Sequence, residues 1–138
     1  MKSYCLDDGR IAYINNFTAL RASTHQNNSC FYVMRFKDLK NLKLVEEVKS
    51  KWDKYGKYVK EKTGRDILVD FFRMVCIGIL LKHNVKMNKV IDKKKSRSSY
   101  AVRISCEITN DNIADDILKE ISVMLDKWMS LQKIIIDR

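Results

Sequence analysis

The chain has 138 residues, of which 46% are hydrophobic and 32% charged, and its formal net charge at pH 7 is +10. This composition excludes an intrinsically disordered chain and fits one folded domain with a sizeable core. No apolar run reaches the roughly 20 residues that span a bilayer, and no secretory signal opens the chain, so we expect an intracellular protein, cytoplasmic or nuclear, without membrane contact.

The first 36 residues favour β-strands. The turn-forming sequence Asp-Asp-Gly-Arg at 7–10 separates two short apolar stretches, 3–6 and 11–14, which predicts an antiparallel hairpin. Strands are also predicted at 17–22 and 30–36, on either side of a polar loop. Alternation between apolar and polar residues is imperfect in 30–36, so the sequence leaves the order of strand pairing open.

A long amphipathic helix follows. From Leu39 to Val59 apolar residues recur every three or four positions, which is the spacing of one helical face. Asp38 is placed to cap its N-terminus, and Thr63 and Gly64 are placed to end it. Gly56 costs about 1 kcal/mol within a helix, which allows a kink or a frayed second half.

A second helix is predicted directly afterwards, from Ile67 to about Lys82, with Asp66 as its N-cap. It is apolar nearly all round, which is typical of a helix at the centre of a core.

The remaining residues predict a hairpin and a last helix. Residues 100–108 alternate cleanly and pair with a strand in 85–91 across the polar loop 92–98. Residues 109–111 cap a long C-terminal helix with an apolar stripe from Ile113 to Ile135. The prediction is a single compact α+β domain over 1–138: N-terminal antiparallel strands and hairpins, two consecutive helices, a basic-tipped β-hairpin and a long C-terminal amphipathic helix.

The positive charge is concentrated in one stretch. Residues 39–98 carry 17 Lys and Arg against 7 Asp and Glu, whereas the two flanking segments together are neutral. A localised surplus of this kind attracts polyanions. We therefore predict a non-enzymatic protein that binds RNA or DNA through backbone phosphates with little sequence preference.

The predicted nucleic-acid-binding residues belong to two groups. The hairpin and its tip supply Lys86, Lys89, Lys93, Lys94, Lys95, Arg97 and Arg103, and the outer face of the first helix supplies Lys51, Lys54 and Lys57. Two further interpretations of the tip remain open, a solvated loop and a nuclear import signal. The helix lysines are interspersed with acidic residues, so a salt-bridged surface is their simplest interpretation.

Aromatic residues in the predicted strands would stack nucleic-acid bases only if one face of the sheet were open. Core packing is the favoured interpretation for these residues, which are Tyr13, Phe17, Phe31, Tyr32 and Phe36.

The C-terminal helix carries an alternative function. Three consecutive apolar residues, Ile134 to Ile136, cannot all face one core, so a protein partner or a frayed end has to account for them. The alternative is an interaction module that forms a homodimer or captures a host protein, as a compact viral antagonist does. Its predicted contacts are Trp128, Leu131, Ile134 and Ile136.

Catalysis, metal binding and cofactor binding have no support in the sequence. The four cysteines show no C-x-x-C spacing and are interpreted as small buried hydrophobic residues. Glu47-Val48-Lys49 resembles half of a nuclease motif but lies in the helical pattern, and the four glycines form no phosphate-binding loop. We expect no enzyme activity, no cofactor, no metal and no small-molecule substrate.

Overall fold

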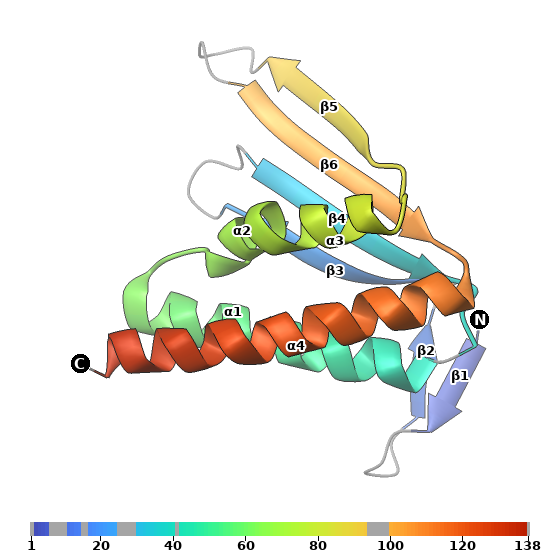
Figure 1. The fold of residues 1–138 in the computed structure, drawn as a ribbon, viewed down its shortest axis with the longest axis horizontal. Helices are drawn as coiled ribbons and strands as arrows, with labels where there is room; N and C mark the ends of the chain where they lie inside the picture. The colour runs from blue at the N-terminus through green and yellow to red at the C-terminus, as the bar shows by residue number, and fades with distance from the viewer. Residues whose placement is uncertain are drawn as a thin grey trace.

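A four-stranded sheet in the order β3-β4-β6-β5 forms one layer of the fold, and the helices form the other (Figure 1). The computed structural model describes residues 2–5, 11–14, 17–24, 30–40, 42–93 and 100–137. The predicted α+β domain is confirmed. The sheet strands are β3 (Phe17–Ser23), β4 (Cys30–Lys37), β5 (Asn88–Lys93) and β6 (Tyr100–Ile108), and a separate antiparallel hairpin pairs β1 (Lys2–Cys5) with β2 (Ile11–Ile14).

The two hairpins of the sheet meet through a parallel pairing. β3 and β4 are antiparallel, as are β5 and β6, while β4 lies parallel to β6 with Tyr32 opposite Ile104 and Met34 opposite Cys106. The β5–β6 hairpin was predicted, whereas the strands β3 and β4 were predicted with their pairing left open. The parallel pairing of β4 with β6 joins residues about 70 positions apart in the sequence, and no local sequence pattern predicts it.

Alternate strand residues lie on opposite faces of the sheet. On the inner face Leu20, Tyr32, Met34 and Cys106 are buried and belong to one hydrophobic core with the buried residues of the helices. Of the aromatic residues assigned to core packing, Tyr32 and Phe36 confirm the prediction, but Phe31 lies on the outer face and is 37% exposed. The side chains of Tyr13 and Phe17 lie outside the described residues.

The first helix, α1 (Leu42–Thr63), begins later than predicted. Asp38 is not its N-cap: Asp38 adopts a left-handed conformation with φ 57°, and Leu39 enters the core before the helix starts. The Lys40 backbone N–H donates to the Asp111 carboxylate at 2.8 Å, which links the segment before α1 to the last helix. The end is as predicted, at Thr63, followed by Gly64 with φ +75°.

The second helix consists of α2 (Ile67–Phe71), a π-helical turn η1 (Phe72–Cys76) and α3 (Ile77–Lys82). Asp66 holds the N-cap position, but its carboxylate makes no capping bond and pairs with Lys60 at 3.3 Å. The prediction of a fully central helix is wrong. Phe71, Phe72 and other residues on one side are buried, whereas Met74 and Leu81 on the other are 74% and 59% exposed.

The last helix, α4 (Asp111–Ile136), is capped by Asn110, whose side chain accepts the N–H groups of Asn112 and Ile113 at 2.9 and 3.3 Å. This confirms the predicted cap. Its apolar stripe is buried at Ile117 and Ile121, but the stripe continues beyond the core.

Candidate nucleic-acid interface

The hairpin residues of the predicted site divide between the two faces of the sheet. Lys89 pairs in register with the inner-face residue Ile104, whereas Arg103 lies on the outer face. The side chains of Lys86, Lys89 and Arg103 are exposed. The Lys93 side chain and all of Lys94, Lys95 and Arg97 lie outside the described residues. Lysines on an edge strand such as β5 also block edge-to-edge pairing with other chains. Preventing such pairing is therefore a second interpretation of Lys89.

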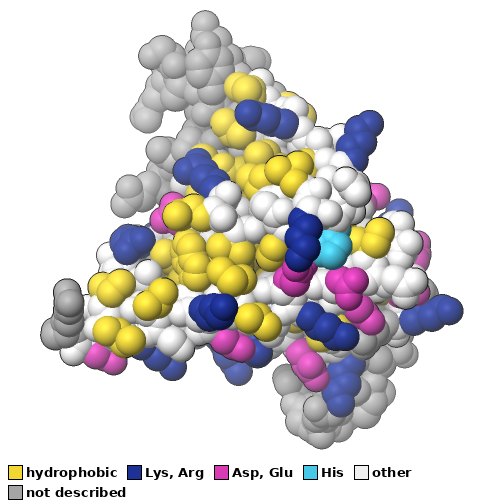
Figure 2. Space-filling model, viewed as in Figure 1, with side chains coloured by type: hydrophobic (Ala, Val, Ile, Leu, Met, Phe, Trp, Pro, Cys, Tyr) yellow, Lys and Arg dark blue, Asp and Glu magenta, His cyan; other side chains and the backbone are white. Residues whose placement is uncertain are grey.

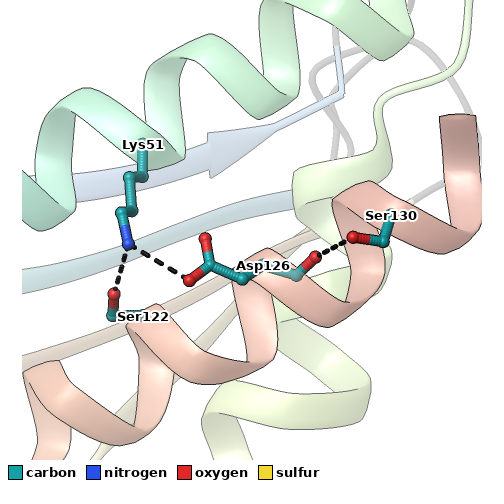
Figure 3. Close-up of polar contacts among 4 residues, drawn as sticks. All are labelled: Lys51, Ser122, Asp126 and Ser130. Carbon is teal, nitrogen blue, oxygen red and sulfur yellow. Dashed lines mark hydrogen bonds and ion pairs between the residues drawn. The ribbon is translucent and has the colours of Figure 1, made fainter.

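One of the three predicted helix lysines makes contacts to another helix. The Lys51 ammonium donates to the Ser122 hydroxyl at 2.9 Å and pairs with the Asp126 carboxylate at 3.2 Å, so it joins α1 to α4 (Figure 3). Lys54 and Lys57 are exposed. The Lys51 ammonium therefore links α1 to α4.

The two predicted groups do not form one patch. α1 lies beside β3 and β5 forms the opposite edge of the sheet, so the whole width of the sheet separates the helix lysines from the hairpin (Figure 1). Three strand spacings amount to about 14 Å. Any common ligand has to cross the sheet.

The outer face of the sheet provides the surface between the two groups. Arg21 and Arg103 on this face are exposed, and Arg35 is half-buried opposite Glu107. The prediction did not include Arg21 or Arg35. In residues 30–37, Phe31, Val33, Arg35 and Lys37 share one face, but the other face is apolar as well, so the alternation alone did not identify the outer face.

The geometry of this face is fixed by the strand register. Phe31 on β4 lies directly opposite Arg103 on β6, and Arg21 on β3 lies opposite Val33, two residues along from Phe31. Diagonal neighbours across strands are about 7–8 Å apart, within reach of long side chains. We refer to Arg21, Phe31 and Arg103 as the sheet-face strip.

Arg21 is held in place from the inner side. The Trp52 indole N–H donates to the Arg21 carbonyl oxygen at 2.8 Å, and Trp52 itself is fully buried. A buried indole is costly unless its N–H is bonded, so this contact fixes β3 against α1.

A charged cleft of about 460 Å³ continues the strip beyond the β3 edge. Arg21 and Lys57 both line it, together with Lys60 and the acidic residues Asp53, Glu61 and Asp66. The cleft therefore brings a predicted helix lysine, Lys57, next to the strip, although the nearby carboxylates offset part of the positive charge.

A set of polar contacts joins β4 to the second helix on the inner side of the sheet. Arg73, in the π-helical turn, donates to the Tyr32 hydroxyl and to the Cys30 sulfur, both at 2.7 Å. Burial raises the pKa of the Tyr32 phenol, and the hydrogen bond to Tyr32 raises the pKa of Arg73. These contacts anchor the second helix to the sheet, and they keep the Arg73 guanidinium on the helix side, away from the strip.

The cysteines behave as predicted where they are described. Cys30, Cys76 and Cys106 are free thiols and buried, and burial raises the pKa of Cys106 to about 11. Within the described part of the chain, no three His, Cys, Asp or Glu side chains come together as metal ligands.

The predicted partner contacts on α4 differ in how far they are exposed. The Trp128 ring packs edge-to-face on the Phe71 ring, with 5.2 Å between the ring centroids, and Ile136 is half-buried. Leu131 and Ile134 are 56% and 65% exposed.

Comparisons with protein-family models, with curated proteins and with solved structures found no match to this chain. Among the residues that the structure describes, no helix has both the length and the apolar character needed to cross a bilayer. The function is therefore inferred from the geometry of the chain's own residues.

Proposed function

We propose that this protein binds single-stranded nucleic acid across the outer face of its sheet, with little sequence preference. The observation that carries the proposal is the sheet-face strip, in which the exposed ring of Phe31 lies between two exposed arginines, Arg21 and Arg103. The helices pack on the other face, so the strip is presented by strands alone.

Each part of the strip has a matching role. Guanidinium groups neutralise phosphates and release counterions, which makes binding strongly dependent on salt. An aromatic ring stacks on any base, which gives affinity without sequence preference. Unpaired bases offer their faces for such stacking, whereas bases within a duplex do not, so the strip favours single strands.

Predicted basic residues flank the strip. Lys57 lies in the cleft beyond the β3 edge, and Lys94, Lys95 and Arg97, which lie outside the described residues, follow β5 in the sequence. We expect a nucleic-acid strand that crosses the sheet to meet positive charge at Lys57, Arg21 and Arg103. Lys51 is left out of the proposed site, because its ammonium is already bonded to α4.

The test is binding of a fluorescently labelled oligouridylate, an oligothymidylate and a duplex, measured by anisotropy between about 50 and 200 mM salt. Arg103→Glu should weaken single-strand binding about tenfold or more and reduce the salt slope by about one. Lys133→Glu is the matched control, because it makes the same change of charge on α4 and should leave affinity within about twofold.

Stacking is tested separately with Phe31→Ala. Stacking of one base contributes about 1–3 kcal/mol, so we expect at least a fivefold loss of affinity with an unchanged salt slope. Equal effects of Arg103→Glu and Lys133→Glu, or no binding at low salt, would reject the proposed site.

A further inference from the structure

A groove on the helix side of the molecule lies apart from the sheet-face strip. It lies between η1–α3 and α4 and encloses about 560 Å³. Met74 and Val123, on opposite walls, are 74% and 54% exposed. Gly78 lies on one wall, and a Cβ at this position would meet no atom within 4 Å. The ion pairs of Glu120 with Lys82 and His83 lie beside the groove. Hydrophobic side chains accordingly gather over this part of the surface (Figure 2).

The groove continues into the exposed end of α4. Ile117, Ile121, Met124, Trp128, Leu131 and Ile135 follow at alternating spacings of four and three residues, which is the seam of a coiled coil. The seam is buried in the core at its start, and at its end Leu131 and Ile135 are 56% and 57% exposed. A seam of this kind normally packs against another helix along its whole length.

We propose that the occupant of this groove is α4 of a second copy of the chain, packed antiparallel to the first. The proposal rests on the charge distribution of α4 and does not depend on nucleic-acid binding. The first ten residues of α4 carry four acidic side chains and one lysine, and the remaining sixteen carry two lysines and one aspartate. Two such helices attract each other when antiparallel and repel when parallel.

The matching residues lie on the groove side of the helix. Asp116, Val123, Lys127 and Ile134 are separated by seven, four and seven residues, so they share one face, and Val123 lines the groove. Asp116 and Lys127 are both exposed.

A two-fold crossing near Val123 brings these groups together. At 1.5 Å per residue, Lys127 of the second copy lies about 6 Å beyond the crossing point, level with Lys119 of the first and between the two acidic residues Asp116 and Glu120. By the same count, Ile134 of the second copy lies level with Asn112, the residue before Ile113. The contact is thus self-complementary, as a two-fold interface requires.

Sedimentation equilibrium of the purified full chain, free of nucleic acid, tests the proposal. We expect a reversible dimer, and both Val123→Glu and Ile134→Glu should raise its dissociation constant more than about tenfold. Val90→Glu is the matched control, since Val90 is 49% exposed on the outer face of the sheet and its variant should leave the constant within about twofold.

A charge swap identifies the partner surface. Lys127→Glu and Asp116→Lys should each weaken the dimer about fivefold, and the double variant should restore it to within about twofold. Lys133→Glu, seven residues after Asp126 and thus on the side of α4 that faces α1, should have little effect. Far-UV circular dichroism verifies that each variant is folded.

A monomer at the highest soluble concentration would overturn the proposal, as would a dimer that Val90→Glu disrupts as strongly as Val123→Glu. Failure of the double variant to recover would overturn the antiparallel arrangement. None of these results bears on oligonucleotide binding, which is measured on the opposite face.

Discussion

Gly56 explains how α1 and α2 come so close. A Cβ at this position would lie 2.5 Å from Leu68 Cδ1 and 3.0 Å from its Cγ, so an alanine would displace the Leu68 side chain. The sequence suggested that Gly56 could kink or fray the helix, but α1 continues through it to Thr63. The glycine therefore serves close packing between helices.

Gly56 and Gly78 form a matched pair for a stability measurement. A Cβ at Gly78 would meet nothing within 4 Å, so Gly78→Ala should gain the helix propensity of alanine, about 0.5–1 kcal/mol. Gly56→Ala should gain nothing, because the displaced Leu68 offsets the propensity. Urea unfolding at low protein concentration measures both. Equal stabilisation by the two variants would show that Leu68 yields without cost.

Glu120 makes the stability depend on pH. Hydrogen bonds from Lys82 and His83 lower the pKa of the Glu120 carboxyl from its ordinary value of about 4.5. A carboxyl with a lowered folded pKa stabilises the fold above its unfolded pKa, and this contribution is lost as the pH falls through the folded pKa. The relevant window therefore lies below about pH 4.5.

Glu120→Gln tests this contribution. The side chain is about a third exposed, so we expect a loss of at most about 1 kcal/mol at pH 7. The difference from the natural chain should shrink as the pH falls below about 4.5. Glu61→Gln, at an exposed carboxylate of α1, is the control and should show a smaller effect at pH 7. A difference for Glu120→Gln that stays constant with pH would contradict the assignment.

At the scale of single elements, α4 depends on its cap. Asn110→Ala removes the acceptor of two N–H groups and should cost about 1 kcal/mol in urea unfolding, with an unchanged m-value. Asn112→Ala, two residues on and exposed, should cost much less. Equal losses would mean that the capping bond contributes little in solution.

Elements were predictable from the sequence where their patterns are local. β6 alternates cleanly from Val102 to Ile108, and both the strand and its inner face follow from that alternation. β4 is apolar on both faces, with Tyr32 and Met34 inside and Phe31 and the buried Val33 outside, so its periodicity does not identify the face that the helices cover. The late start of α1 depends on Asp111, 71 residues from Lys40, and no local signal reveals it.

At the scale of the molecule, charge that is continuous along the chain is divided in space. The basic segment 39–98 includes α1 at one edge of the sheet and β5 at the other, because three helical segments intervene between them (Figure 1). The candidate site therefore could not be predicted by adding charges along the sequence. It requires β3 and β4, which carry Arg21 and Phe31 and lie outside that segment.

The two proposed surfaces occupy opposite faces of the domain. The sheet-face strip lies on the strands, and the groove between η1–α3 and α4 lies on the helices. A dimer through α4 would therefore leave the sheet-face strip of each copy facing outward. Nucleic-acid binding and self-association should consequently vary independently among the variants described above.

The central proposal is tested most directly by titrating the isotopically labelled protein with a short single-stranded oligonucleotide and following its backbone amide resonances. We expect shifts concentrated at Arg21, Phe31 and Arg103 and in the basic loop after β5, with α4 unchanged. Shifts confined to the helices, or a spectrum that the oligonucleotide does not change at low salt, would contradict binding across the sheet.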